Sequence, residues 1–111
     1  MRDDRQRLLD ILDAIEKIEK YINAENDFVP LSESDLYQVW VAHHLQIIGE
    51  AASKLSEEFR KQHPEVAWGG MIGMRHVLVH GYFETDLDAV WNAVENDLPL
   101  LKRQIQAILT Q

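Results

Sequence analysis

Apolar residues recur at alternating intervals of three and four positions near both ends of this 111-residue chain, and this spacing limits the fold more than any other feature. Such spacing places apolar side chains on one face of an α-helix. We expect a first helix from about Asp4 to Asn23, with the apolar face Leu8, Ile11, Ile15, Ile18 and Ile22. We expect a last helix from a cap at Asp86 to Thr110, kinked at Pro99, with the apolar face Leu87, Trp91, Val94, Leu98, Leu101, Ile105 and Ile108.

A long central helix is expected between them. Ser32-Glu33-Ser34-Asp35 resembles a capping box, so this helix should begin at Ser32 and continue to about Gln62. It should end at His63-Pro64, because the residue before a proline disfavours the helical conformation.

A turn at Pro64–Ala67 and a flexible joint at Trp68–Gly70 should follow, and then a third helix from near Met71 to close to Gly81. No segment shows the strict alternation of apolar and polar residues that is typical of strands. The sequence therefore predicts an all-α fold, an antiparallel bundle of four main helices plus a short extra turn, in one domain that covers residues 1–111.

The net charge of −8 argues against one class of function, the coating of nucleic acid by a broad basic surface. Any contact with RNA would need a local cationic pocket. The chain has no cysteine, which excludes disulfides and thiolate chemistry. Because no apolar stretch resembles a signal peptide or a bilayer-spanning helix, we expect a soluble, cytoplasmic protein with no membrane partner.

The short apolar run from Met74 to Phe83 contains the strongest candidates for chemistry. Arg75 can bind a phosphate, His80 can transfer a proton, and Tyr82 offers a reactive hydroxyl. One straight helix would not direct all three groups to one point. A break near Gly81, the reach of the arginine or a second subunit could bring them together; alternatively, Arg75 pairs with an acidic neighbour such as Glu50 and supports only the fold.

The number of large apolar side chains around this run suggests a dimer. One small bundle would not cover all of them, whereas a symmetric dimer could bury the rest; they are Trp68, Met71, Ile72, Met74, Val77, Leu78 and Phe83. A dimer would also place two copies of Arg75 and His80 across one cleft. RNA cleavage by the 2′-hydroxyl needs one group that takes a proton and one that returns it, together with positive charge on the phosphorane.

Metal binding is the weaker interpretation of the histidines. His76 and His80 are four residues apart, as in a zinc half-site, but valine follows His76 and the spacing offers no third ligand. We therefore expect no metal and no cofactor. His43 and His44 are interpreted as residues at the boundary of a broad helix face.

At these residues the chain resembles the HepT-like toxins, a branch of the HEPN superfamily of helical ribonucleases. The resemblance covers almost the whole chain. Its blocks are Arg7–Ile15, Leu45–Ala51, Pro64–Trp68, Arg75–Phe83 and the segment from Trp91 through Asp97-Leu98-Pro99.

The resemblance implies the toxin of a type VII-like toxin–antitoxin module, a metal-independent endoribonuclease with its cleft at a homodimer interface. Arg75 and His80 would be catalytic, with Arg75 on the scissile phosphate and His80 in proton transfer. Tyr82 would be the regulatory position, because in this family a nucleotidyltransferase antitoxin, MntA, transfers AMP to that hydroxyl. The added anion would block the cleft and cancel its positive charge.

The sequence leaves the role of one residue undecided and allows two other functions. The family commonly has asparagine where this chain has His76, which could contact substrate, share the proton transfer or act on His80. A non-catalytic helical module that docks a nucleotidyltransferase or a nucleotide would also suit the acidic composition. The third option is a metal-dependent enzyme that uses His76 and His80. The resemblance implies RNA as the substrate, and it leaves open whether that RNA is tRNA or mRNA.

Overall fold

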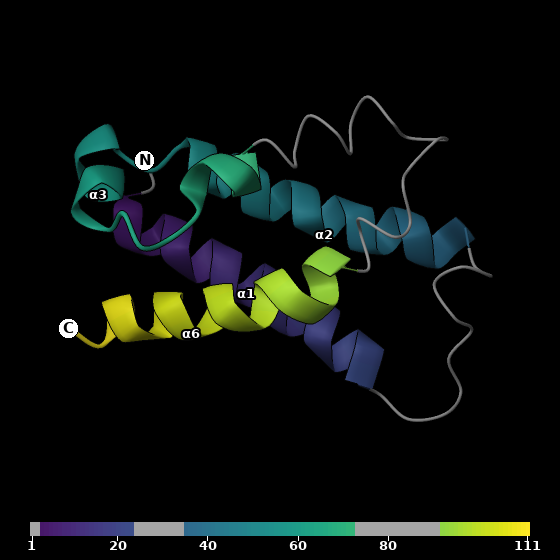
Figure 1. The fold of residues 1–111 in the computed structure, drawn as a ribbon. Coiled ribbons are helices and arrows are strands. Elements are labelled where there is room, and N and C mark those ends of the chain that lie inside the picture. Colours follow the sequence, from purple (N-terminus) through teal and green to yellow (C-terminus); the bar gives the residue numbers. More distant parts are fainter. Residues whose placement is uncertain (1–2, 24–34, 73–91) are drawn as a thin grey trace.

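The computed structural model describes residues 3–23, 35–72 and 92–111. They form an all-α arrangement with no strand among them, which confirms the predicted fold class. Figure 1 shows α1 (Asp4–Asn23) lying against α2 (Asp35–Ser53) and α6 (Leu98–Leu109), which both run antiparallel to it. The remaining described helical elements are α3 (Glu57–Gln62), residues 68–72 and the π-helical turn η2 (Ala93–Asp97).

The first helix begins and ends where the sequence predicts. Its start is fixed by a reciprocal pair of hydrogen bonds. The Gln6 amide donates to Asp3 Oδ1 at 2.8 Å, and the Asp3 amide donates to Gln6 Oε1 at 2.9 Å. This is a capping box, which satisfies amides that have no partner within the helix.

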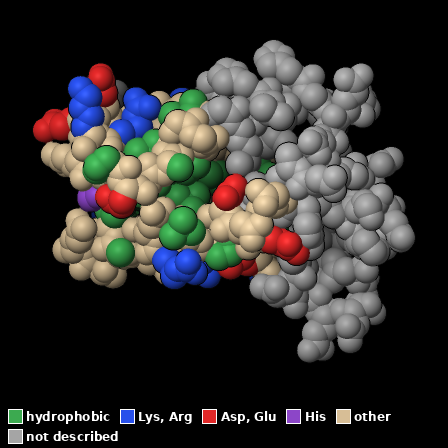
Figure 2. Space-filling view, in the orientation of Figure 1, with side chains coloured by type: hydrophobic (Ala, Val, Ile, Leu, Met, Phe, Trp, Pro, Cys, Tyr) green, Lys and Arg blue, Asp and Glu red, His purple; other side chains and the backbone are tan. Residues whose placement is uncertain are grey.

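The core lies where the apolar faces of α1, α2 and α6 meet. Most members predicted from spacing are confirmed as buried in α1, η2 and α6: Leu8, Ile11, Ile15, Ile18, Val94, Leu98, Leu101 and Ile105. The predicted member Ile108 is only partly buried. From α2 the core receives chiefly Val41, Leu45 and Ile48. The side chains of Ile22, Leu87 and Trp91 lie outside the described residues. Figure 2 shows that hydrophobic side chains also reach the surface between residues 63–72 and α6.

The prediction of one continuous helix as far as Gln62 is wrong. Helix α2 ends at Ser53, and α3 begins at Glu57. Ser56 caps α3, since its hydroxyl oxygen accepts a hydrogen bond from the Phe59 amide at 3.1 Å. The predicted start at Ser32 lies outside the described residues, whereas the predicted end before His63-Pro64 is confirmed.

The prediction of a flexible joint at Trp68–Gly70 is also wrong. Residues 68–72 are helical, and the Met71 amide donates to the Ala67 carbonyl at 3.2 Å. Trp68 is buried, and its indole Nε1 donates to the His63 carbonyl at 2.9 Å. The buried aromatic side chain holds in place a segment that its two glycines alone would leave loose.

This burial weakens one argument for a dimer. Trp68 and Met71 lie in the core of a single chain, and Ile72 packs against it. These three side chains therefore need no second subunit to cover them. Met74, Val77, Leu78 and Phe83 lie outside the described residues.

A π-helical turn, η2, precedes Pro99, the position of the predicted kink. The turn η2 ends at Asp97, which holds the N-cap position of α6 without a cap hydrogen bond from its side chain, and Pro99 follows in the first turn of that helix. A proline costs no hydrogen bond there, because the first amides of a helix have no partner within it. The predicted start at Asp86 lies outside the described residues. No helix in the described part of the chain is long and apolar enough to cross a bilayer.

Candidate functional site

The residues predicted to carry the chemistry, Arg75, His76, His80 and Tyr82, lie outside the described residues. The described chain stops at Ile72, three positions before Arg75. Within it, the turn that leads to the motif is tied to the core through Trp68 and Met71. The structure therefore shows how the residues just before the predicted motif are held against the core.

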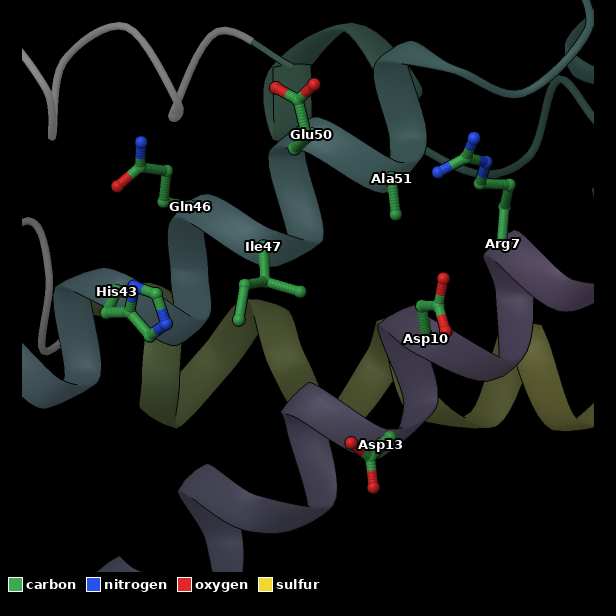
Figure 3. Close-up of a pocket in the computed structure, with 8 residues that line it drawn as sticks. All are labelled: Arg7, Asp10, Asp13, His43, Gln46, Ile47, Glu50 and Ala51. Carbon is green, nitrogen blue, oxygen red and sulfur yellow. The ribbon is translucent and has the colours of Figure 1, made fainter. Parts of the chain in front are cut away.

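A groove with many polar side chains lies between α1 and α2. It has a volume of about 390 Å³, and Figure 3 shows side chains from both helices along it. Its lining consists of Arg7, Asp10, Asp13, His43, Gln46, Ile47, Glu50 and Ala51. The spacing explains this composition. Arg7, Asp10 and Asp13 repeat every three residues, so they form the polar edge of α1 beside its apolar face.

Carboxylates are the most numerous charged groups in the lining of the groove, and lysines pair with two of them. Asp13 forms an ion pair with Lys17 at 3.0 Å, and Glu50 forms one with Lys54 at 3.3 Å. Both pairs join residues four apart on an exposed helix surface, where such pairs contribute little to stability. Arg7 and the two lysines together match the three carboxylates of the groove in number, so its charges are largely balanced.

The two adjacent histidines of α2 have different surroundings. His43 is exposed and lines the groove, as a boundary residue should. His44 is buried, and its Nδ1 lies 2.8 Å from the Trp40 carbonyl oxygen. Because a carbonyl only accepts, Nδ1 carries the hydrogen in this contact. The His44 ring also packs on Trp40 with the ring centroids 4.2 Å apart, so His44 is a core residue.

Lysines on the described surface are mostly occupied by carboxylates. Besides the two pairs of the groove, Lys61 pairs with Glu57 at 3.2 Å and Lys102 with Glu19 at 2.9 Å. Within the described ranges, no three His, Cys, Asp or Glu side chains come together as a metal site would require. Four lysines of the described surface are thus engaged by carboxylates, and the net charge of the chain is acidic.

The groove was not foreseen from the sequence. From the sequence, Glu50 is considered only as a possible partner for Arg75. The available signal was the spacing of polar residues on both helices, with His43, Gln46 and Glu50 at intervals of three and four. This spacing indicates a groove only when α1 and α2 are known to pack side by side.

Comparison with known proteins identifies the family. The family described as "Ribonuclease HepT-like" matches residues 11–108, which include the whole of the Arg75–Phe83 motif. The chain belongs to the HepT-like ribonuclease family. Relatives agree with this assignment along nearly the full length of the chain.

Two HepT-like relatives illustrate the extent of the match. A protein of Methanocaldococcus jannaschii named "Putative RNase MJ1380" is 30% identical over 107 residues, which are 96% of this chain and 97% of the relative. A protein of Thermococcus cleftensis named "Probable ribonuclease HepT" is 36% identical over 107 residues, which are 96% of each chain. No solved structure gives a significant match to this HepT-like chain.

Proposed function

We propose that this HepT-like protein is a metal-independent endoribonuclease in which Arg75 and His80 are the catalytic residues. The observation that carries the proposal is the family match, because it spans the motif from end to end. The charge distribution supports it. The net charge of −8 argues against a broad basic surface, so phosphate binding depends on a local cation such as Arg75. His76, next to that arginine, is proposed as a further substrate contact.

The proposed reaction is attack of the ribose 2′-oxygen on the adjacent phosphorus. A base removes the 2′-hydroxyl proton, a new P–O2′ bond forms, and the P–O5′ bond breaks. An acid protonates the departing 5′-oxygen, which leaves a 2′,3′-cyclic phosphate and a 5′-hydroxyl. Arg75 stabilises the charge of the phosphorane. Each subunit contributes one His80, so a homodimer supplies both the base and the acid at one cleft.

The reaction type is tested with matched substrates. The purified protein should cleave an oligoribonucleotide in the presence of EDTA and should produce cyclic phosphate ends. The same oligonucleotide with a single 2′-deoxyribose at the cleaved position should resist cleavage there, because the attacking oxygen is gone. Equal cleavage of the deoxy substrate would rule out this mechanism, and activity that EDTA abolishes would rule out metal independence.

We further propose that the protein is the toxin of a toxin–antitoxin pair and that AMP transfer to Tyr82 inactivates it. In the transfer, the Tyr82 oxygen forms a bond to the α-phosphorus of ATP and pyrophosphate leaves. The added phosphate brings negative charge and bulk to a cleft that must hold an anionic substrate.

Intact mass measures this modification. Protein that is co-expressed with its nucleotidyltransferase partner should gain the mass of AMP, mapped to Tyr82, and should lose RNA cleavage. The Tyr82→Phe variant is the matched control, since it lacks only the acceptor oxygen, and it should gain no mass and remain active. An unchanged mass in the wild-type protein, or inactivation of Tyr82→Phe to the same extent, would contradict the proposal.

A further inference from the structure

A second hollow in the described surface has a different character from the polar groove. It lies between α2, residues 65–71 and α6 and has a volume of about 230 Å³. Its floor is formed by side chains buried in the core, among them Ile48, Met71 and Leu98. Figure 2 shows this surface as a patch of hydrophobic side chains with charged side chains of both signs around it. The surface is therefore an apolar pocket with a charged rim.

The walls of the pocket are held in position by hydrogen bonds. Gln104 Nε2 of α6 donates to the Glu65 carbonyl at 3.0 Å, which ties two walls together. The indole of Trp68 donates to the His63 carbonyl, and that bond fixes the turn behind the same wall. A pocket shaped in advance loses little conformational entropy when a group enters it.

The rim determines what can enter. Glu65 and Asp97 line it, and Lys and Arg are absent from the lining among the described residues, while Glu65 Oε1 also lies 3.3 Å from His63 Nδ1. Leu100 also lines the pocket and is 49% exposed, so apolar surface continues outward from the floor. A second copy of this chain would bring a like-charged rim against Glu65 and Asp97 in a two-fold contact, which is unfavourable.

The volume of the pocket also limits which kind of ligand it can bind. Pockets for small molecules and cofactors usually measure about 300–1,000 Å³, and this pocket is smaller. It fits an apolar side chain, the type of anchor that sits at the centre of protein interfaces. We propose that this pocket docks a peptide segment of a partner protein in which one large apolar side chain is flanked by Lys or Arg. This docking surface is independent of the ribonuclease chemistry proposed for Arg75 and His80.

The two neighbouring glycines offer a matched pair of variants. Gly70 lines the pocket, and an added Cβ would meet only the Ala67 Cβ at 4.0 Å. Gly69 does not line it, and an added Cβ there meets no atom within 4 Å. Gly70→Leu should therefore fill the pocket without displacing the backbone, and Gly69→Leu should leave it open.

Fluorescence anisotropy with a labelled peptide that has one leucine between runs of lysine tests the proposal. The wild-type protein and Gly69→Leu should bind it, and Gly70→Leu should bind about tenfold more weakly, as expected when a central pocket is blocked. A peptide with alanine in place of leucine, and one with glutamate in place of lysine, should both bind more weakly than the original.

Circular dichroism shows whether Gly70→Leu folds. If it does not, variants of the rim test the same proposal. Glu65→Gln together with Asp97→Asn should weaken binding of the lysine peptide and reduce its sensitivity to salt. Equal binding by wild type and Gly70→Leu, equal binding of the leucine and alanine peptides, or no binding at all would overturn the proposal. Self-association through this face, lost in Gly70→Leu, would also overturn it.

Discussion

The side chain of Asp4 links α1 to the start of α3. Its Oδ1 accepts a hydrogen bond from the Ser56 amide at 2.8 Å, and its Oδ2 accepts one from the Ser56 hydroxyl at 2.7 Å. The same hydroxyl oxygen caps α3 by accepting from the Phe59 amide. The carboxylate therefore orients the residue that begins α3, and it does so from the first turn of α1.

Replacement of Asp4 should consequently destabilise the fold. Asp4→Ala removes both acceptors, and we expect the free energy of unfolding to fall by about 1 kcal/mol, the usual effect of losing a cap or a charge-assisted hydrogen bond. Urea denaturation measures this change. Asp13→Ala is the matched control, because its carboxylate makes only an exposed pair with Lys17, and its effect should stay below about 0.5 kcal/mol. Equal effects of the two variants would contradict the role of Asp4.

At the scale of the element, the two wrong predictions have one cause. The apolar positions Leu55 and Phe59 continue the pattern of α2, so periodicity alone supports one long helix through them. The break depends instead on the contact between Asp4 and Ser56, which are 52 residues apart. Likewise, two adjacent glycines indicate a joint, but burial of the Trp68 side chain makes the segment helical. Local patterns contain neither of these tertiary contacts.

The contact between α1 and α6 contains an ion pair that should respond to pH. Lys102 Nζ forms an ion pair with Glu19 Oε1 at 2.9 Å, and each side chain is 29% exposed. This contact with Glu19 raises the pKa of Lys102 above its ordinary value of 10.5, helped by the charge of Glu16 and opposed by burial. A raised pKa in the folded state means that the pair stabilises the fold fully below pH 10.5 and stops doing so as the pH rises through the raised value.

We expect Lys102→Met to lower the free energy of unfolding near neutral pH by up to about 1 kcal/mol. The difference from wild type should shrink in denaturation experiments above pH 10.5. Lys61→Met, which removes an exposed pair within α3, is the control and should show little difference at any pH. If the difference in free energy of unfolding between wild type and Lys102→Met stayed unchanged at high pH, the stabilising role of the Lys102–Glu19 pair would be contradicted.

For the whole molecule, the fold class and the ends of α1 were predictable because apolar periodicity fixes which faces pack together. The groove between α1 and α2 was not, since residues such as Asp10 and Gln46 are far apart in sequence and meet only after the helices pack. The predicted site at Arg75 and His80 came from its motif and from the family resemblance. It stays a prediction, because these residues lie outside the described part of the chain.

The charge of the whole molecule is consistent with this location for the chemistry. The net charge is −8, and four lysines on the described surface are paired with carboxylates. Arg7 lines the polar groove together with three carboxylates, and Lys and Arg are absent from the described lining of the apolar pocket. An RNA-cleaving protein of this composition therefore needs a compact site with its own cation and proton-transfer group.

The rate of RNA cleavage by purified His80→Ala and Arg75→Ala, relative to wild type, tests this account most directly. Arg103→Ala, on the exposed surface of α6, is the matched control for the loss of an arginine. We expect a fall of at least about 100-fold for each catalytic variant, since removing a proton-transfer or charge-stabilising group typically has this effect. Arg103→Ala should cleave like wild type, and circular dichroism should show all three variants folded. Full activity in folded His80→Ala or Arg75→Ala would contradict the central claim.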